Sequence, residues 1–277
     1  MKNQVLHLVL PTENVEFKIV ELANWIGKVF IVPRVNLRDL KDRKEINDPA
    51  VYFLFGESAD LEKQKLYIGE TETFLSRLTT HDQTKDFWNV AIIFTGGLDK
   101  AKVKYLEYLA NKEASSANRF DLQNSTVPKE NNLSEFDEIS TRDYFEKVAY
   151  ILAVFGYPVF ESIEESLSDT TVYYLKADGA DAKAQLLNDG SLNVLKDSVA
   201  RIRESKSFWG WSQNARRKFL EEGTLIELED GVSYKFTRDV LFKSPSAAAA
   251  TVTGRPINGW TSWKDTQGVT LDENIRK

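Results

Sequence analysis

The sequence predicts an α+β protein with two domains: a small antiparallel sheet flanked by helices, followed by a smaller β-rich α+β domain. Three observations support this prediction. Short runs of β-branched and aromatic residues alternate with longer segments of helical periodicity. A chain of 277 residues has room for one large domain or two ordinary ones. A charged, serine-rich stretch after Gly156-Tyr157-Pro158 is typical of a linker.

We expect the chain to divide into four segments. They are an N-terminal β extension over 1–49, a main domain with a trailing helix over 50–160, a linker over 161–170 and an accessory domain over 171–277. In the first segment, apolar runs at 17–20 and 28–32 predict strands. The charged residues that follow predict a surface turn or a short helix.

Two apolar runs, 51–56 and 65–69, are separated by a polar loop and predict an antiparallel hairpin. Because side chains alternate along a strand, Tyr67 and Gly69 share one face of the second strand. A position without a side chain leaves room for another group to approach the backbone. We expect Tyr52, on the first strand, to lie across the hairpin from this position.

A helix is predicted from Glu72 to His81, with Thr71 as its N-cap. Arg77 and His81 are four residues apart, so they lie on the same face of this helix. A third strand is expected over 87–94.

Glu107 lies within the apolar stripe of the next predicted helix, over 99–116, four residues after Val103 and three before Ala110. A carboxylate that faces a core or a cleft is costly unless it is paired or bound to a cation. A salt bridge, to Arg77 or to a lysine, and a cation site both satisfy this requirement.

A polar loop and a helix over 136–154 complete the main domain. In the accessory domain, Asn188-Asp189-Gly190 and Asp230-Gly231 predict hairpin turns, and residues 214–222 predict a helix. Ser244 is expected as the N-cap of a last helix, which has proline in its first turn and glycine at its end.

Composition excludes several kinds of site. With no cysteine and two histidines, His7 and His81, the chain cannot build a zinc finger or a histidine-cluster metal centre. No stretch approaches 18 consecutive apolar residues, so we expect no membrane span, and the first residues do not form a signal peptide. The absence of cysteine fits a cytoplasmic protein.

The net charge of −6 argues mildly against non-specific coating of nucleic acid. The charge is uneven, however. Residues 201–277 hold 13 Lys and Arg against 10 Asp and Glu, and residues 1–200 hold the remaining 23 against 32. The two parts therefore carry +3 and −9, which describes an acidic main domain and a mildly basic accessory domain.

The order and spacing of the singled-out residues resemble the GIY-YIG nuclease family over roughly residues 48–125. The matching positions are Ala50-Val51-Tyr52, Tyr67-Ile68-Gly69, Arg77, His81 and Glu107 within Lys104-Tyr105-Leu106-Glu107. The stretch 24–34 resembles the lead-in of a bacterial subgroup. The segments 242–249 and 258–264 resemble a module of unknown function that is attached to such nucleases and to restriction–modification proteins.

This resemblance implies a GIY-YIG-type sheet and metal-dependent hydrolysis of DNA phosphodiester bonds. It implies that Glu107 holds one Mg²⁺ or Mn²⁺ ion, because an oxygen ligand suits a cation that also binds substrate phosphate. Arg77 would clamp the phosphate or stabilise a phenolate. Tyr52 or Tyr67 would take a proton from water, which requires a nearby cation to lower the phenol pKa.

The resemblance also implies two supporting residues. His81 would share the proton-accepting role or hydrogen-bond a tyrosine. Asn124 is the candidate for an asparagine that braces the site, and Asn118 is the poorer alternative.

The sequence departs from the family pattern at three points. Ala50 and Val51 are mild replacements that keep the phenol of the first motif, and the loop between the two motifs is a few residues longer than usual. Glu70 stands where some members have lysine, which adds a negative charge near the phosphate. This charge would weaken catalysis or favour a second cation.

The accessory domain carries a basic and aromatic set that is typical of nucleic-acid binding. Its members are Arg216, Arg217, Arg255, Trp260, Trp263 and Lys264. The alternative is that the tryptophans belong to the core of a β-rich module. Asn258-Gly259 is expected to form a turn.

Three functions follow from these patterns. The first is a DNA endonuclease, acting in restriction or repair, with a DNA-targeting accessory domain. The second is a catalytically weak or inactive scaffold that binds DNA or assembles a complex. The third is that the accessory domain mediates protein contacts, such as a homodimer.

Overall fold

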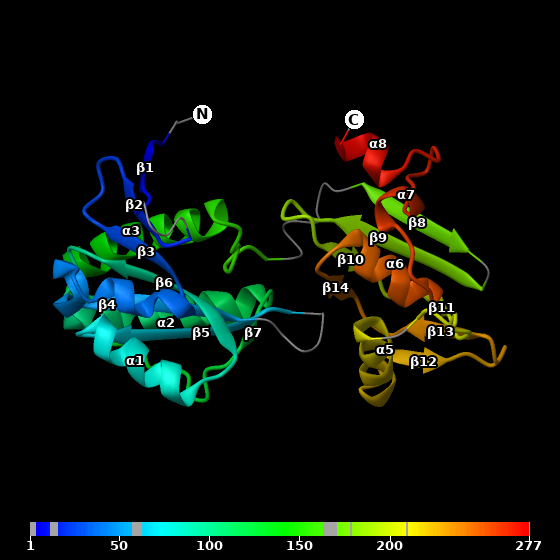
Figure 1. Ribbon diagram of the computed structural model, residues 1–277, viewed down its shortest axis with the longest axis horizontal. Coiled ribbons are helices and arrows are strands. Elements are labelled where there is room, and N and C mark those ends of the chain that lie inside the picture. Colours follow the sequence, from blue (N-terminus) through cyan, green and yellow to red (C-terminus); the bar gives the residue numbers. More distant parts are fainter. Residues whose placement is uncertain are drawn as a thin grey trace. The chain divides into compact units, whose positions relative to one another are not determined.

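A computed structural model describes residues 4–11, 16–56, 63–162, 171–177, 179–208 and 210–276. These residues form two compact units, each with helices and its own sheet, so the α+β class is confirmed (Figure 1). The first unit holds the described residues up to 56 and from 64 to 161; the second holds those from 162 onward. No helix in the described ranges is long and apolar enough to cross a membrane.

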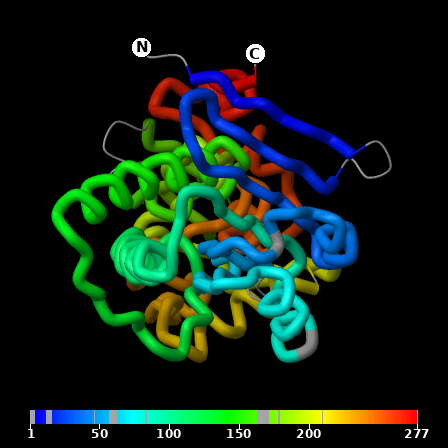
Figure 2. Tube along the Cα trace, turned by 90° about the vertical axis from the view of Figure 1, so that its left-hand side faces the viewer, coloured from blue at the N-terminus to red at the C-terminus, as the bar shows by residue number. Residues whose placement is uncertain are grey.

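The first unit is built on a seven-stranded sheet with the order β1-β2-β3-β6-β4-β5-β7. Its strands are β1 (Leu6–Val9), β2 (Lys18–Leu22), β3 (Lys28–Pro33), β4 (Ala50–Gly56), β5 (Lys65–Thr71), β6 (Trp88–Thr95) and β7 (Asp121–Leu122). All neighbours are antiparallel except β5 and β7. The expected N-terminal β extension therefore continues the main sheet, and its meander is blue in Figure 2.

Helices cover both faces of this sheet. On one face lie the 3₁₀ helices η1 (Arg34–Leu40) and η2 (Lys44–Asn47) and the helix α1 (Phe74–Thr84). Leucines of η1 and α1 pack there against Tyr52 and Leu54 of β4. On the other face lie α2 (Lys100–Ala117) and α3 (Glu135–Val154), which pack against Phe53 of β4 and Ile68 of β5. Alternate side chains along β4 and β5 point to opposite faces of the sheet and thus belong to two separate cores.

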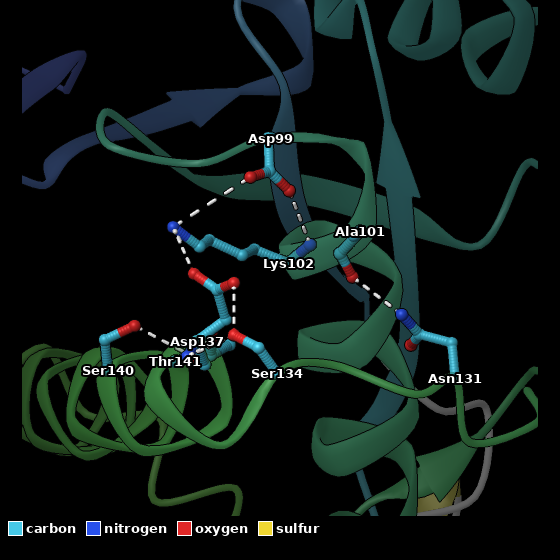
Figure 3. Close-up of polar contacts among 8 residues, drawn as sticks. All are labelled: Asp99, Ala101, Lys102, Asn131, Ser134, Asp137, Ser140 and Thr141. Atoms are coloured by element: carbon cyan, nitrogen blue, oxygen red, sulfur yellow. Dashed lines mark hydrogen bonds and ion pairs between the residues drawn. The ribbon is translucent and has the colours of Figure 1, made fainter.

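Helices α2 and α3 begin at side-chain caps that are tied together (Figure 3). The Asp99 carboxylate accepts the N–H of Lys102, and the Ser134 hydroxyl accepts the N–H of Asp137. The Lys102 ammonium lies 3.3 Å from Asp137 and 3.9 Å from Asp99. These contacts fix the start of α2, the helix that carries Glu107, against the start of α3.

The second unit contains a sheet with the order β12-β13-β11-β9-β10-β14, and β8 pairs with β9. Its strands are β8 (Val172–Ala177), β9 (Ala180–Leu186), β10 (Leu192–Val194), β11 (Val199–Arg201), β12 (Leu225–Glu227), β13 (Ser233–Phe236) and β14 (Val240–Phe242). Its helices are α5 (Trp211–Glu221), α6 (Pro245–Thr253), α7 (Gly259–Ser262) and α8 (Leu271–Arg276). Both predicted hairpins, β9–β10 and β12–β13, are confirmed.

Two predicted boundaries were wrong, for local reasons. Helix α1 begins at Phe74 with Thr73 as N-cap, because Thr71 still pairs with Ala50 in the sheet. Asn258 is the N-cap of the short helix α7 and does not form a simple turn. The predicted start of α6 is confirmed, since the Ser244 hydroxyl accepts the N–H of Ala247.

Candidate active site

Two strands and one helix bring the predicted tyrosines, arginine and histidine together on one face of the first sheet. Tyr52 lies directly opposite Gly69 across the β4–β5 hairpin, as predicted. A Cβ at Gly69 would stand 2.4 Å from the Tyr52 hydroxyl and 2.5 Å from Cζ. The glycine is therefore required, because the phenol ring occupies the space of its missing side chain.

Tyr52 connects the two polar residues of α1. Arg77 donates from Nε to the Tyr52 hydroxyl at 3.3 Å, and the same hydroxyl lies 2.8 Å from Nε2 of His81. Since arginine can only donate, the Tyr52 proton is free to point at Nε2. Tyr52 and His81 are buried, whereas Arg77 is largely exposed. The result is a short hydrogen-bonded chain that leads inward from the surface.

Burial sets the protonation of this chain. It raises the pKa of the Tyr52 phenol well above its usual range, and the neighbouring Tyr67 phenol adds to this effect while Arg77 opposes it. Burial also lowers the pKa of His81 to about 4, assisted by the positive charges of Arg77 and Lys85. At neutral pH, Tyr52 and His81 are therefore both uncharged.

Tyr67 is the accessible phenol of the pair. It is partly exposed, and its ring lies 6.2 Å from that of Tyr52 and 5.1 Å from that of His81, measured between centroids. The ammonium of Lys85 sits 4.2 Å from the centre of the Tyr67 ring. Arg77 is also hydrogen-bonded to Tyr67, and this contact helps to raise the pKa of the arginine after the larger effect of Tyr52.

Lys85 is a cation of this site that the sequence did not predict. It follows His81 by four positions and Arg77 by eight, and this helical spacing is the signal that points to it. The structure places Lys85 directly after α1, as its C-cap. Its ammonium has no hydrogen-bond or ion-pair partner among the described residues.

Glu107 is a partly buried carboxylate without an ion pair in the described part of the chain. Burial raises the pKa of Glu107 to about 7, and the negative charge of Glu70 raises it further. A hydrogen bond from the main chain of Glu70 and the charges of Arg77 and Lys104 act in the opposite direction. The salt bridge that would explain Glu107 as a structural residue is therefore not formed.

Two carboxylates, Glu107 and Glu70, are the groups of this site that could hold a cation. Within the described ranges, no three His, Asp or Glu side chains gather as a closed metal centre. A single carboxylate beside a second one, Glu70, matches the way Mg²⁺ binds through one or two carboxylates together with water and phosphate.

Asn124 braces the strand that carries Tyr67. Its side-chain amide donates to the carbonyl of Ile68 at 2.7 Å and accepts the N–H of Ile68 at 3.1 Å. The pair of bonds continues the sheet edge beyond β7. Asn118, the alternative, ends α2 in a left-handed conformation with φ 51°.

Two predicted nucleic-acid contacts in the second unit require correction. Arg216 is 2% exposed, and its guanidinium donates to the carbonyls of Thr251, Arg201, Ile202 and Val252. Trp263 is fully buried, and its indole N–H donates to the carbonyl of Pro245. Both side chains are held inside the unit, so neither offers a surface to DNA.

The other predicted contacts lie at or near the surface. Arg217, Arg255 and Lys264 are exposed, and they come from α5 and from the segments that follow α6 and α7. Trp260 is partly exposed, and the guanidinium carbon of Arg276 lies 3.6 Å from the centre of its ring.

The two sequence motifs of the second unit contact each other. A Cβ at Gly259 would lie 2.1 Å from the carbonyl of Pro245, so only glycine allows this approach. The N–H of Gly259 donates to the Ser246 hydroxyl, next to the bond between Trp263 and Pro245. The motifs therefore form a packing junction between α6 and α7.

Comparison with known proteins gives one family match. Residues 173–275, nearly all of the second unit, match the family described as domain of unknown function DUF4357. Neither the curated proteins nor the solved structures contain a match to the chain.

Proposed function

We propose that the protein is a metal-dependent DNA endonuclease of the GIY-YIG type, acting in the cytoplasm in DNA restriction or repair. The observation that carries the proposal is the convergence of Tyr52, Tyr67, Arg77 and His81 on one face of the sheet. They come from two strands and a helix, in the order and spacing of the nuclease family that the sequence resembles.

The two tyrosines have different roles in this proposal. Two cations, Arg77 and Lys85, lie beside the accessible Tyr67, which takes a proton from the attacking water. Tyr52 is buried and stays a neutral phenol that orients Arg77 and His81. Environments that separate two like groups in this way are typical of acid–base sites.

The remaining polar groups bind substrate and metal. Arg77 and Lys85 contact the oxygens of the scissile phosphate. Glu107, with Glu70 nearby, holds the Mg²⁺ or Mn²⁺ ion, which polarises the phosphate and neutralises developing charge when bound. Asn124 keeps the β5 edge, and with it Tyr67, in place.

A cleavage assay tests the proposal. Full-length protein is incubated with supercoiled, linear and branched DNA in Mg²⁺, in Mn²⁺ or in EDTA. We expect metal-dependent nicking that Glu107→Gln and Arg77→Gln reduce by at least about a hundredfold. Glu113→Gln, on the same helix, is the matched control and should cut normally. No cleavage of any DNA form with either metal would refute the nuclease.

A second candidate is a scaffold that binds DNA without turnover. It is favoured by Glu70, whose charge helps to raise the pKa of Glu107 to about 7 and so leaves part of this carboxylate protonated at neutral pH. In that case the wild type binds DNA but does not cut it, and Glu70→Lys gains activity. A normal metal-dependent turnover rate in the wild type rules this candidate out.

A further inference from the structure

The second unit contains a cavity of about 340 Å³ that the sequence analysis did not identify. It is lined by Gly179, Arg201, Ile202, Arg203, Gly231 and Val232. These residues come from the β8–β9 turn, from the end of β11 and from the β12–β13 turn. Three segments that are distant in the sequence thus surround one space.

Two guanidinium groups of this lining have no acceptor. Arg201 is the last residue of β11, and Arg203 follows two positions later. Neither side chain forms a hydrogen bond or an ion pair with any residue that the structure describes. Each guanidinium therefore keeps its five N–H donors for a ligand.

Glycine turns leave space beside these arginines. Gly179 and Gly231 adopt φ values of 75° and 67°, a left-handed conformation that favours glycine. The stem of Arg201 packs beside the first of them, since a Cβ at Gly179 would lie 3.5 Å from its Cγ. At Gly179 and Gly231 the cavity is therefore bordered by main chain without a side chain.

The arginines near the cavity differ in their partners. The buried Arg216 guanidinium donates to the carbonyls of Arg201 and Ile202, two residues of the lining. Glu204 lies 3.7 Å from Arg216. Asp230, in the β12–β13 turn, accepts the N–H groups of Val232 and Ser233. Among the described residues, Arg216 is thus engaged with main-chain carbonyls and Glu204, whereas Arg201 and Arg203 have no ion pair.

We propose that this cavity is a phosphate-binding site, with Arg201 and Arg203 as its ligands and the DNA backbone as the source of the phosphate. A planar guanidinium group can donate two parallel hydrogen bonds to the oxygens of one phosphate. Two such groups suit the binding of one phosphodiester. The volume of about 340 Å³ lies in the range of small-ligand pockets. The choice of DNA as the ligand rests on the proposed nuclease function. The proposal of a phosphate site does not depend on that function.

The first arm of the test measures DNA binding without cleavage. Full-length Glu107→Gln protein in EDTA is titrated with a labelled DNA duplex by fluorescence anisotropy at several KCl concentrations. Adding Arg201→Gln and Arg203→Gln should weaken binding about tenfold and reduce the slope of log K against log salt by about 0.9, the value for one lost phosphate contact.

The control removes the same charge elsewhere. Lys196→Gln with Lys243→Gln takes two exposed charges from the same unit and should leave the slope closer to the parent value. Unfolding midpoints in KCl show whether each variant is folded. The double variant Arg201→Gln with Arg203→Gln is called the glutamine pair. If the glutamine pair does not fold, Arg201→Lys with Arg203→Lys replaces it. The lysine variant keeps both positive charges and loses the two-pronged hydrogen bonds of the guanidinium groups.

The second arm identifies the source of the phosphate. Inorganic phosphate should raise the unfolding midpoint of the wild type, compared with KCl at equal ionic strength, and should not raise that of the glutamine pair. A phosphate effect with an unchanged DNA slope would overturn DNA as the source. No effect in either arm would overturn the site. Cleavage by the wild type is measured separately. The phosphate-binding result can therefore be interpreted even if the protein does not cut DNA.

Discussion

At the scale of single residues, the Tyr52 hydroxyl is the point where the site and the core meet. It receives the Arg77 N–H and lies within hydrogen-bond distance of His81, deep in the face formed by β4 and β5. Under the proposed function, a group in this position should contribute to both stability and cleavage. The effects of its removal should therefore appear in two independent measurements.

Tyr52→Phe should destabilise the protein by about 1–3 kcal/mol, because it leaves the buried His81 and the Arg77 Nε without their partner. Urea denaturation followed by tryptophan fluorescence measures the loss. Tyr150→Phe, at an exposed position of α3, is the matched control. A Tyr52 variant as stable as the wild type would show that these bonds contribute nothing to folding.

The ionised carboxylate of Glu107 should lower the free energy of unfolding of the protein at high pH. Its pKa is raised from 4.5 to about 7, so the folded state favours the protonated form. Its contribution to stability is therefore fully present below pH 4.5 and is lost as the pH rises through 7. Without metal, Glu107→Gln should be more stable than the wild type by about 1–3 kcal/mol at pH 8, with little difference at pH 4.

Denaturation of both proteins in EDTA at these two pH values measures the difference. A pH-independent difference, or a less stable variant at pH 8, would contradict the raised pKa.

His81 should show the opposite pH dependence. Its pKa is lowered from 6.5 to about 4, so its contribution to stability is present above pH 6.5 and is lost as the pH falls through 4. With two histidines in the chain, an NMR titration gives two imidazole signals. The variant His7→Gln assigns them. A His81 signal that titrates near 6.5 would show that the ring is not buried as described.

At the scale of elements, the β4–β5 hairpin is the frame of the site, and much of it follows from the sequence. Strand alternation and the missing side chain at Gly69 predict that Tyr52 lies opposite, as the structure confirms. Local chemistry likewise predicts both hairpins of the second unit and the Ser244 cap. Such features are encoded within a few neighbouring residues.

Features that depend on distant contacts could not be predicted. The burial of Arg216 requires the carbonyls of β11, of Ile202 directly after it and of α6, which lie 14 to 36 residues away in the chain. Lys85 joins the site through its contact with the ring of Tyr67, which lies on another element, β5. A charged side chain in a sequence is expected at the surface, and only the fold shows which ones turn inward.

Gly69→Ala should damage the hairpin and the site together. The new Cβ would overlap the Tyr52 ring, which has buried neighbours and cannot shift freely. We expect a loss of about 1–3 kcal/mol in stability and a strong loss of cleavage. Gly190→Ala, in the second unit, is a control for cleavage alone, because its φ of 83° makes a side chain strained there although no atom lies within 4 Å of the added carbon. Normal activity of Gly69→Ala would contradict the close approach.

At the scale of the whole molecule, the two units share no hydrophobic cluster. The two clusters of the first unit contain residues up to Phe160, and that of the second begins at Tyr173. Two units without a common core should unfold as two transitions in calorimetry. Gly69→Ala should lower only one midpoint, and Gly259→Ala, which would collide with Pro245, only the other. A single transition that both variants shift would show that the units fold as one.

Asn124 has a consequence beyond the site. An exposed strand edge is a template on which a second chain can pair, and such edges lead to aggregation. Past β7, the edge of β5 has its Ile68 N–H and carbonyl occupied by the Asn124 amide. A single side chain thus takes the place of a neighbouring strand at Ile68, and we expect it to disfavour pairing with a second chain there.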